Sequence, residues 1–158
     1  MVDSAAPRDQ QVSPLQVIST LYRVRDRLLG GSAAGQHYRK LYERHTGRIS
    51  TLLLLSPGLR SAGGRLLRGF TPGLNRLADG VGHEMVITRQ MVTEVMTFLQ
   101  LLAEADQAQR GGELAKAIWL EMARLDWNRL ADVTFDQAWR YLDSINLSTP
   151  MYLPAILK

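Results

Sequence analysis

Histidine and acidic residues are the first candidates for chemistry, because the chain has three histidines and no cysteine. Metal binding needs such side chains at fixed spacings. His83-Glu84 matches the first two residues of a zinc-protease helix motif, but that motif needs a second histidine where this chain has Ile87. His37 and His45 lie eight residues apart, about two helical turns, and no further ligand follows the same spacing. We therefore expect no metal site.

A glycine-rich segment and three aspartates are candidates for phosphate binding and for acid–base catalysis. Residues 58–65 read Gly-Leu-Arg-Ser-Ala-Gly-Gly-Arg, which has glycines at a phosphate-loop spacing but lacks the lysine and the following Ser or Thr that hold phosphate and magnesium. Asp132, Asp136 and Asp143 have the spacing of carboxylates on a solvated helix face, and nothing in the sequence marks a pocket beside them. These patterns predict no catalytic residue, no cofactor and no enzymatic activity.

Arginine gives the strongest charge signal, since only three of the nineteen basic residues are lysines. Residues 23–79 carry eleven basic and three acidic side chains, a balance of +8, whereas residues 80–147 carry six basic and ten acidic side chains, a balance of −4. The guanidinium group pairs well with both carboxylates and phosphates. The densest basic set is Arg44, Arg48, Arg60, Arg65, Arg68 and Arg76.

Two interpretations of this arginine set are open at the level of sequence. In the first, the arginines form a solvated face and pair with the acidic second half of the chain. In the second, they contact an anionic partner such as nucleic acid or lipid headgroups. No aromatic side chains alternate with the arginines, which disfavours binding modes that stack bases and leaves nonspecific phosphate contact.

Length and composition favour one globular domain. The chain has 158 residues, of which 46% are hydrophobic, and a net charge of +4; a chain of this length can bury roughly 70% of its unfolded surface. No segment approaches the roughly 20 apolar residues of a membrane span, and residues 1–13 lack the apolar core of an export signal. We expect a cytoplasmic protein if the chain stands alone, and an extracellular one if it is a fragment of a secreted parent.

Apolar spacing and capping residues predict a series of helices and no convincing strand. A kink or short restart is expected in the second helix at Thr46-Gly47, because glycine costs about 1 kcal/mol in a helix interior. The first four predicted helices begin at Ser13-Pro14, Ser32, Ser56-Pro57 and Thr71-Pro72, where a capping hydroxyl stands, in three cases followed by proline.

The longest predicted helix runs from about Gly82 to Gln109 and has an apolar face wide enough to contact neighbours on more than one side. A further helix follows Gly112, and Thr134 with Gln137 forms a capping box for the last one. Together these elements predict an all-α bundle or irregular helical array of six to seven helices with one long central helix. We expect a single helical domain over residues 14–147, between a flexible N-terminal segment (1–13) and a C-terminal tail (148–158).

The first half of the chain also resembles a known module. The resemblance is based on four segments: Arg23-Val24-Arg25-Asp26-Arg27-Leu28-Leu29, Ser32-Ala33-Ala34-Gly35, Leu41-Tyr42-Glu43-Arg44-His45-Thr46-Gly47-Arg48-Ile49 and Pro57-Gly58-Leu59-Arg60. They resemble the helical tail module that closes many large multidomain bacterial extracellular proteins, over residues about 18–80. Thr46 stands where that module has serine, and Arg48 where it has an acidic residue. The resemblance implies a terminal packing or attachment role without catalytic residues.

The sequence therefore predicts a non-enzymatic helical interaction or structural module, as a subunit or terminal attachment domain of a larger bacterial assembly. Its expected partner is another protein or the parent chain. The alternative is a nucleic-acid-contacting helical subunit that uses the arginine-rich first half.

Overall fold

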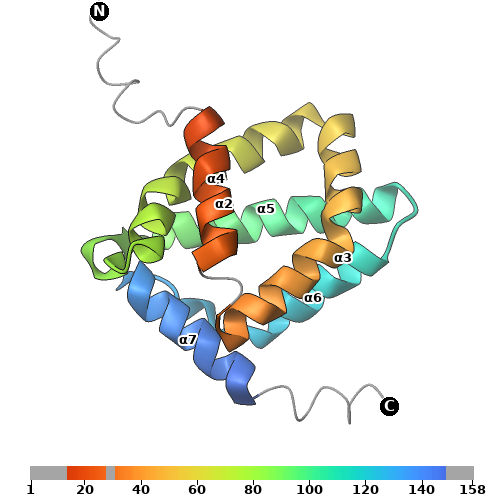
Figure 1. The fold of residues 1–158 in the computed structure, drawn as a ribbon. Coiled ribbons are helices and arrows are strands. Elements are labelled where there is room, and N and C mark those ends of the chain that lie inside the picture. Colours follow the sequence, from red (N-terminus) through yellow and green to blue (C-terminus); the bar gives the residue numbers. More distant parts are fainter. Residues whose placement is uncertain (1–13, 28–30, 149–158) are drawn as a thin grey trace, which may run out of the picture.

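Helices dominate the structure, a computed structural model that describes residues 14–27 and 31–148 (Figure 1). The α-helices of these residues are α2 (Pro14–Arg27), α3 (Ala33–Leu55), α4 (Pro57–Ala78), α5 (Arg89–Ala108), α6 (Glu113–Arg124) and α7 (Phe135–Ser148). Between them lie the single-turn helices η2 (Gly82–Glu84) and η3 (Trp127–Arg129) and the strands β1 (Val86–Ile87) and β2 (Val133–Thr134). The predicted all-α array is confirmed, with six α-helices in the described part. The predicted N-terminal segment and, apart from Ser148, the predicted tail lie outside it.

Side-chain caps fix three of the helix starts, as the sequence predicts. In each case a hydroxyl accepts a hydrogen bond from a backbone N–H three residues later, which satisfies a donor that has no partner within the helix. The Gln137 side chain also accepts from the Thr134 amide, which completes the predicted capping box. The pairs are Ser32 with Gly35 at 3.0 Å, Ser56 with Leu59 at 3.2 Å, and Thr134 with Gln137 at 3.0 Å.

Of the two outcomes expected at Thr46-Gly47, a kink or a short restart, the restart does not occur. α3 continues as one helix from Ala33 to Leu55, and Figure 1 shows that it bends partway along its length. The buried Leu52 lies one turn beyond the glycine, and burying such a side chain stabilises the fold by about 1.5–3 kcal/mol, more than the cost of one glycine. Burial of the second half of α3 therefore outweighs the local break.

The helix start predicted at Thr71-Pro72 is wrong, because α4 runs through this pair as far as Ala78. The hydroxyl of Thr71 donates to the Leu67 carbonyl at 2.6 Å, so this side chain bonds to the preceding turn instead of capping a new one. Gly73, which follows Pro72, lies so close to the Phe135 ring of α7 that a Cβ atom there would be 2.1 Å from ring carbons. Packing between the two helices holds α4 together across the proline.

The predicted long helix begins later than expected. Gly82–Glu84 form η2 and Val86–Ile87 form β1, so that α5 starts only at Arg89, after the Thr88 hydroxyl accepts from the Met91 amide at 3.1 Å. The prediction of no strand is also corrected: β1 pairs antiparallel with β2, at Val86 with Thr134 and Ile87 with Val133. Strands of two residues are too short to show an alternating pattern in the sequence.

Two apolar clusters form the core. The first joins α3, α4, α5 and α6 through Leu52, Leu59, Leu102, Ala103, Leu114, Ala115 and Ile118. The second lies around the short sheet and α7 and contains Leu77, Ile87, Val92, Leu130, Ala131, Phe135 and Ala138. α2 packs on α4, where Arg23 pairs with Asp79 and Arg27 donates to the same carboxylate at 3.0 Å. No helix in the described ranges has the length and apolar character needed to cross a bilayer.

Candidate functional site

A cavity of about 470 Å³ lies at the centre of the helical array. Its wall is almost wholly apolar and is built by α3, α5, α6 and α7 with contributions from Phe70 of α4, Ile87 of β1 and Trp127 of η3. Small-molecule sites in proteins have volumes of roughly 300–1,000 Å³, mostly apolar walls and a few polar groups. Tyr38, Tyr42, His45 and Glu121 are polar residues of the lining, and they present almost no polar surface to the cavity itself.

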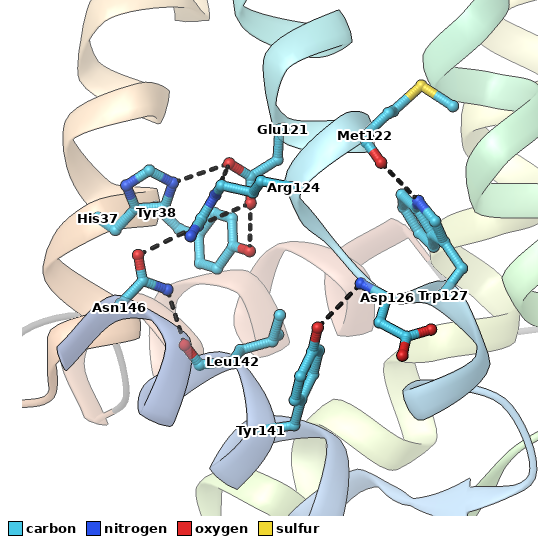
Figure 2. A network of polar contacts seen from close by, with 10 residues as sticks. All are labelled: His37, Tyr38, Glu121, Met122, Arg124, Asp126, Trp127, Tyr141, Leu142 and Asn146. Carbon is cyan, nitrogen blue, oxygen red and sulfur yellow. Dashed lines mark hydrogen bonds and ion pairs between the residues drawn. The ribbon is translucent and has the colours of Figure 1, made fainter. Parts of the chain in front are cut away.

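A polar network at one side of the cavity ties three helices together (Figure 2). Glu121 of α6 accepts hydrogen bonds from Tyr38 of α3 at 2.6 Å and from the guanidinium of Arg124 at 2.8 and 3.0 Å, and it pairs with Nε2 of His37 at 2.9 Å. Arg124 also donates to the Asn146 side chain of α7 at 3.1 Å. Figure 2 shows these side chains pointing toward one another between the helices.

The network changes the proton affinity of its members. Burial alone would raise the pKa of Glu121, but the hydrogen bonds from His37, Arg124 and Tyr38 outweigh it and hold the pKa of this carboxyl at about 2. Burial, together with the neighbouring carboxylate, raises the pKa of the Tyr38 hydroxyl well above its usual value. A carboxylate with so low a pKa is a poor general base, since effective bases have pKa values near the working pH.

A buried carboxylate, that of Asp106, joins α3 to the start of α6. Asp106 is 1% exposed and accepts from Nε of Arg48 at 2.6 Å and from the backbone amides of Gly112 and Ala115 at 2.8 and 2.9 Å. Burial opposes ionisation of this group, yet the donated hydrogen bonds keep its pKa below the usual value. The backbone of Gly111 passes so close that a Cβ atom there would overlap the carboxylate. Asp106 therefore holds the turn between α5 and α6 in place.

His45 is buried in the middle of α3, not at the end of a helical segment as its neighbours Thr46-Gly47 suggest. It lines the central cavity and also a second hollow, of about 520 Å³, at the start of α6. Arg44, Arg48 and Arg110 supply the cationic groups of that hollow. His45 and Leu114 belong to both walls, so the apolar and the polar space adjoin at these two side chains.

The six predicted anion-contact arginines separate into two groups. Three of them are bonded within the fold: Arg48 to Asp106, Arg60 to the carbonyls of Leu53 and Leu54 at 2.8 and 2.9 Å, and Arg76 to Glu84 at 3.2 Å. The other three, Arg44, Arg65 and Arg68, are exposed and make no side-chain hydrogen bond or ion pair with the residues the structure describes. The pairing of Arg48 and Arg76 with acidic residues of the second half agrees with the first interpretation of the charge asymmetry.

Other candidates take structural positions. Glu84 of the His83-Glu84 pair bonds to Arg76, and Asp143 accepts from the Ala34 amide at the start of α3 at 2.9 Å. Across residues 14–27 and 31–148, no three potential metal ligands come together. Sequence reasoning missed the cavity and the roles of Glu121 and Asp106, because the α3 side chains that meet these carboxylates, His37, Tyr38 and Arg48, lie 58 to 84 residues away along the chain.

Comparison of the chain with family models, with curated proteins and with solved structures gives no match.

Proposed function

We propose that this chain is a non-enzymatic helical interaction or structural module, a subunit or terminal attachment domain of a larger assembly. The observation that carries the proposal is the turn between α3 and α4, here called the leucine corner, which is held by hydrogen bonds and exposes Leu54 and Leu55. The carboxylates of Glu121 and Asp106 also support the proposal, because both already accept hydrogen bonds from donors within the fold. Neither group is free to transfer a proton or to attack a substrate.

The corner is held by polar contacts while its apolar side chains face solvent. Arg60 donates to the carbonyls of Leu53 and Leu54, and Ser56 caps the start of α4, so the backbone groups at the turn are satisfied. Leu54 and Leu55 are nevertheless 77% and 59% exposed. Two adjacent leucines on a well-bonded turn form an apolar contact point that needs little ordering when a partner binds.

The partner is identified by photo-crosslinking from position 54 in cells that produce the protein, and is then purified and titrated against the chain. Burying each leucine in an interface contributes about 1.5–3 kcal/mol. The double substitution Leu54→Ser with Leu55→Ser is therefore expected to weaken the measured affinity more than a hundredfold. Circular dichroism should show an unchanged fold, because both side chains are in solvent.

Leu147→Ser provides the matched control, since Leu147 of α7 is 70% exposed at a different place in the fold. It should leave the affinity within a factor of two. If the purified chain is a monomer that turns over a substrate, or if the double variant binds the partner as tightly as the wild type, the proposal is wrong.

A nucleic-acid-contacting subunit is the second candidate, supported by the three arginines that have no partner among the described residues. Neutralising a phosphate contact reduces the slope of binding against salt by about one. A mobility-shift series in rising salt, with Arg65→Gln and Arg68→Gln as variants, distinguishes this candidate. Absence of binding at low salt would end it.

A further inference from the structure

We propose that the central cavity binds a long-chain aliphatic carboxylic acid, with its alkyl chain inside the apolar walls and its carboxylate at the His45 end. This site is separate from the leucine corner, and its test needs only the isolated chain. Failure of either proposal therefore leaves the other standing.

The size of the cavity and its apolar walls determine what kind of alkyl chain the ligand has. Leucine, isoleucine and valine side chains make up most of the lining, so the enclosed part of a ligand must be apolar. A cavity of about 150 Å³ is enough to hold benzene, which has six carbon atoms. By that scale the 470 Å³ here suit a molecule of roughly eighteen non-hydrogen atoms, the size of a sixteen-carbon fatty acid.

His45 supplies the polar end. Its side chain is only 7% exposed and has no hydrogen-bond partner among the residues that the structure describes. In the same residues, no side-chain nitrogen or oxygen is fully enclosed without a partner. The ring nitrogens of His45 therefore reach accessible space, and the polar hollow that His45 lines provides it, because the wall of the central cavity is almost wholly apolar. A buried imidazole in this position can donate a hydrogen bond to a ligand oxygen.

Charge favours an anionic head group at this end. Arg44 and Arg110 line the polar hollow and make no side-chain hydrogen bond or ion pair with the described residues, whereas Arg48 is neutralised by Asp106. Glu113 is the one further acidic residue in the described part of the chain that lines it, which leaves a net charge of +1. The opposite polar group, Glu121, is itself an anion and is already saturated, so it offers no donor to a carboxylate.

Isothermal titration calorimetry of the full chain with hexadecanoate and with hexadecan-1-ol tests both the binding of the alkyl chain and the preference for a carboxylate. The two probes share the same alkyl chain and differ in the head group. We expect hexadecanoate to bind with one-to-one stoichiometry and about tenfold more tightly than the alcohol, because hydrogen bonds to a charged group are the stronger ones. Arg44→Gln with Arg110→Gln should remove that preference, and Arg65→Gln, on α4, should keep it.

Ala117→Phe and Val95→Phe test whether the alkyl chain of the ligand lies in the central cavity, because both residues line the cavity and a phenylalanine ring would fill part of it. Either variant should lower the affinity for hexadecanoate at least tenfold while its thermal unfolding stays cooperative. Ala123→Phe, at an exposed position of the same helix as Ala117, should bind as the wild type does. Three results would overturn the proposal: no saturable binding of hexadecanoate, equal affinity for acid and alcohol, or unchanged affinity in both folded cavity variants.

Discussion

Replacing Glu121 with glutamine should destabilise the protein in a way that depends on pH. The carboxylate pairs with His37 and accepts from Tyr38 and Arg124, and its side chain is only 14% exposed. Glutamine has nearly the same shape but no charge. Glu121→Gln therefore keeps the shape of the side chain, removes its charge, and replaces one of its two accepting oxygens with an amide nitrogen that can only donate.

The size of the effect follows from the proton affinity of this carboxyl. Its pKa is about 2 in the folded protein and 4.5 in the absence of the fold. One pKa unit corresponds to 1.36 kcal/mol, so the ionised group stabilises the folded state by about 3 kcal/mol. Because the folded pKa is the lower one, this contribution is present in full above about pH 4.5 and is lost as the pH falls toward 2.

Urea unfolding of wild type and Glu121→Gln, followed by circular dichroism between pH 7 and pH 2.5, measures this directly. The difference in the free energy of unfolding should be about 3 kcal/mol at pH 7 and should shrink steadily below pH 4.5. Glu43→Gln removes an exposed carboxylate that pairs with Arg39 on the same helix, and should cost less than 1 kcal/mol. A difference for Glu121→Gln that stays constant across this pH range, or that equals the value for Glu43→Gln, would refute the reasoning.

Two further substitutions test the contacts between helices. Asp106→Ala should lower the free energy of unfolding by about 3–5 kcal/mol in a urea titration, because it leaves Arg48 and two backbone amides without their acceptor; a loss below 1 kcal/mol would contradict this. Gly73→Ala should cost about 1–3 kcal/mol through overlap with the Phe135 ring, and Phe135→Leu in the same chain should make the added methyl group less costly; equal melting temperatures for wild type and Gly73→Ala would argue against this close packing.

The starts of the helices were predictable from the sequence where nearby capping residues determine them. Ser32, Ser56 and the Thr134–Gln137 pair act as caps because the hydroxyl and its target amide are only three residues apart. Thr71-Pro72 carries the same local signal but lies inside α4. The helix continues through this pair because Gly73 packs against Phe135, which lies more than sixty residues later in the chain. A contact between such distant residues leaves no local pattern in the sequence.

The candidate sites were less predictable, because they depend on contacts between distant parts of the chain. Asp106 has an unremarkable position in the sequence, and its role arises only when α3 brings Arg48 beside the turn before α6. Glu121 is likewise one carboxylate on an amphipathic helix until His37 and Tyr38 meet it. The signal that could have been used is the charge asymmetry, which predicts pairing between the halves without specifying the pairs.

The central cavity poses an energetic problem that its proposed ligand would solve. The side chains that line it present an almost wholly apolar accessible surface and lose the packing contacts that a filled core would supply. Water replaces these contacts poorly, because an ordered water needs two to four polar partners. An occupant with matching apolar surface recovers the lost contacts, so a ligand at a hundred times its dissociation constant should add about 2.7 kcal/mol to the free energy of unfolding.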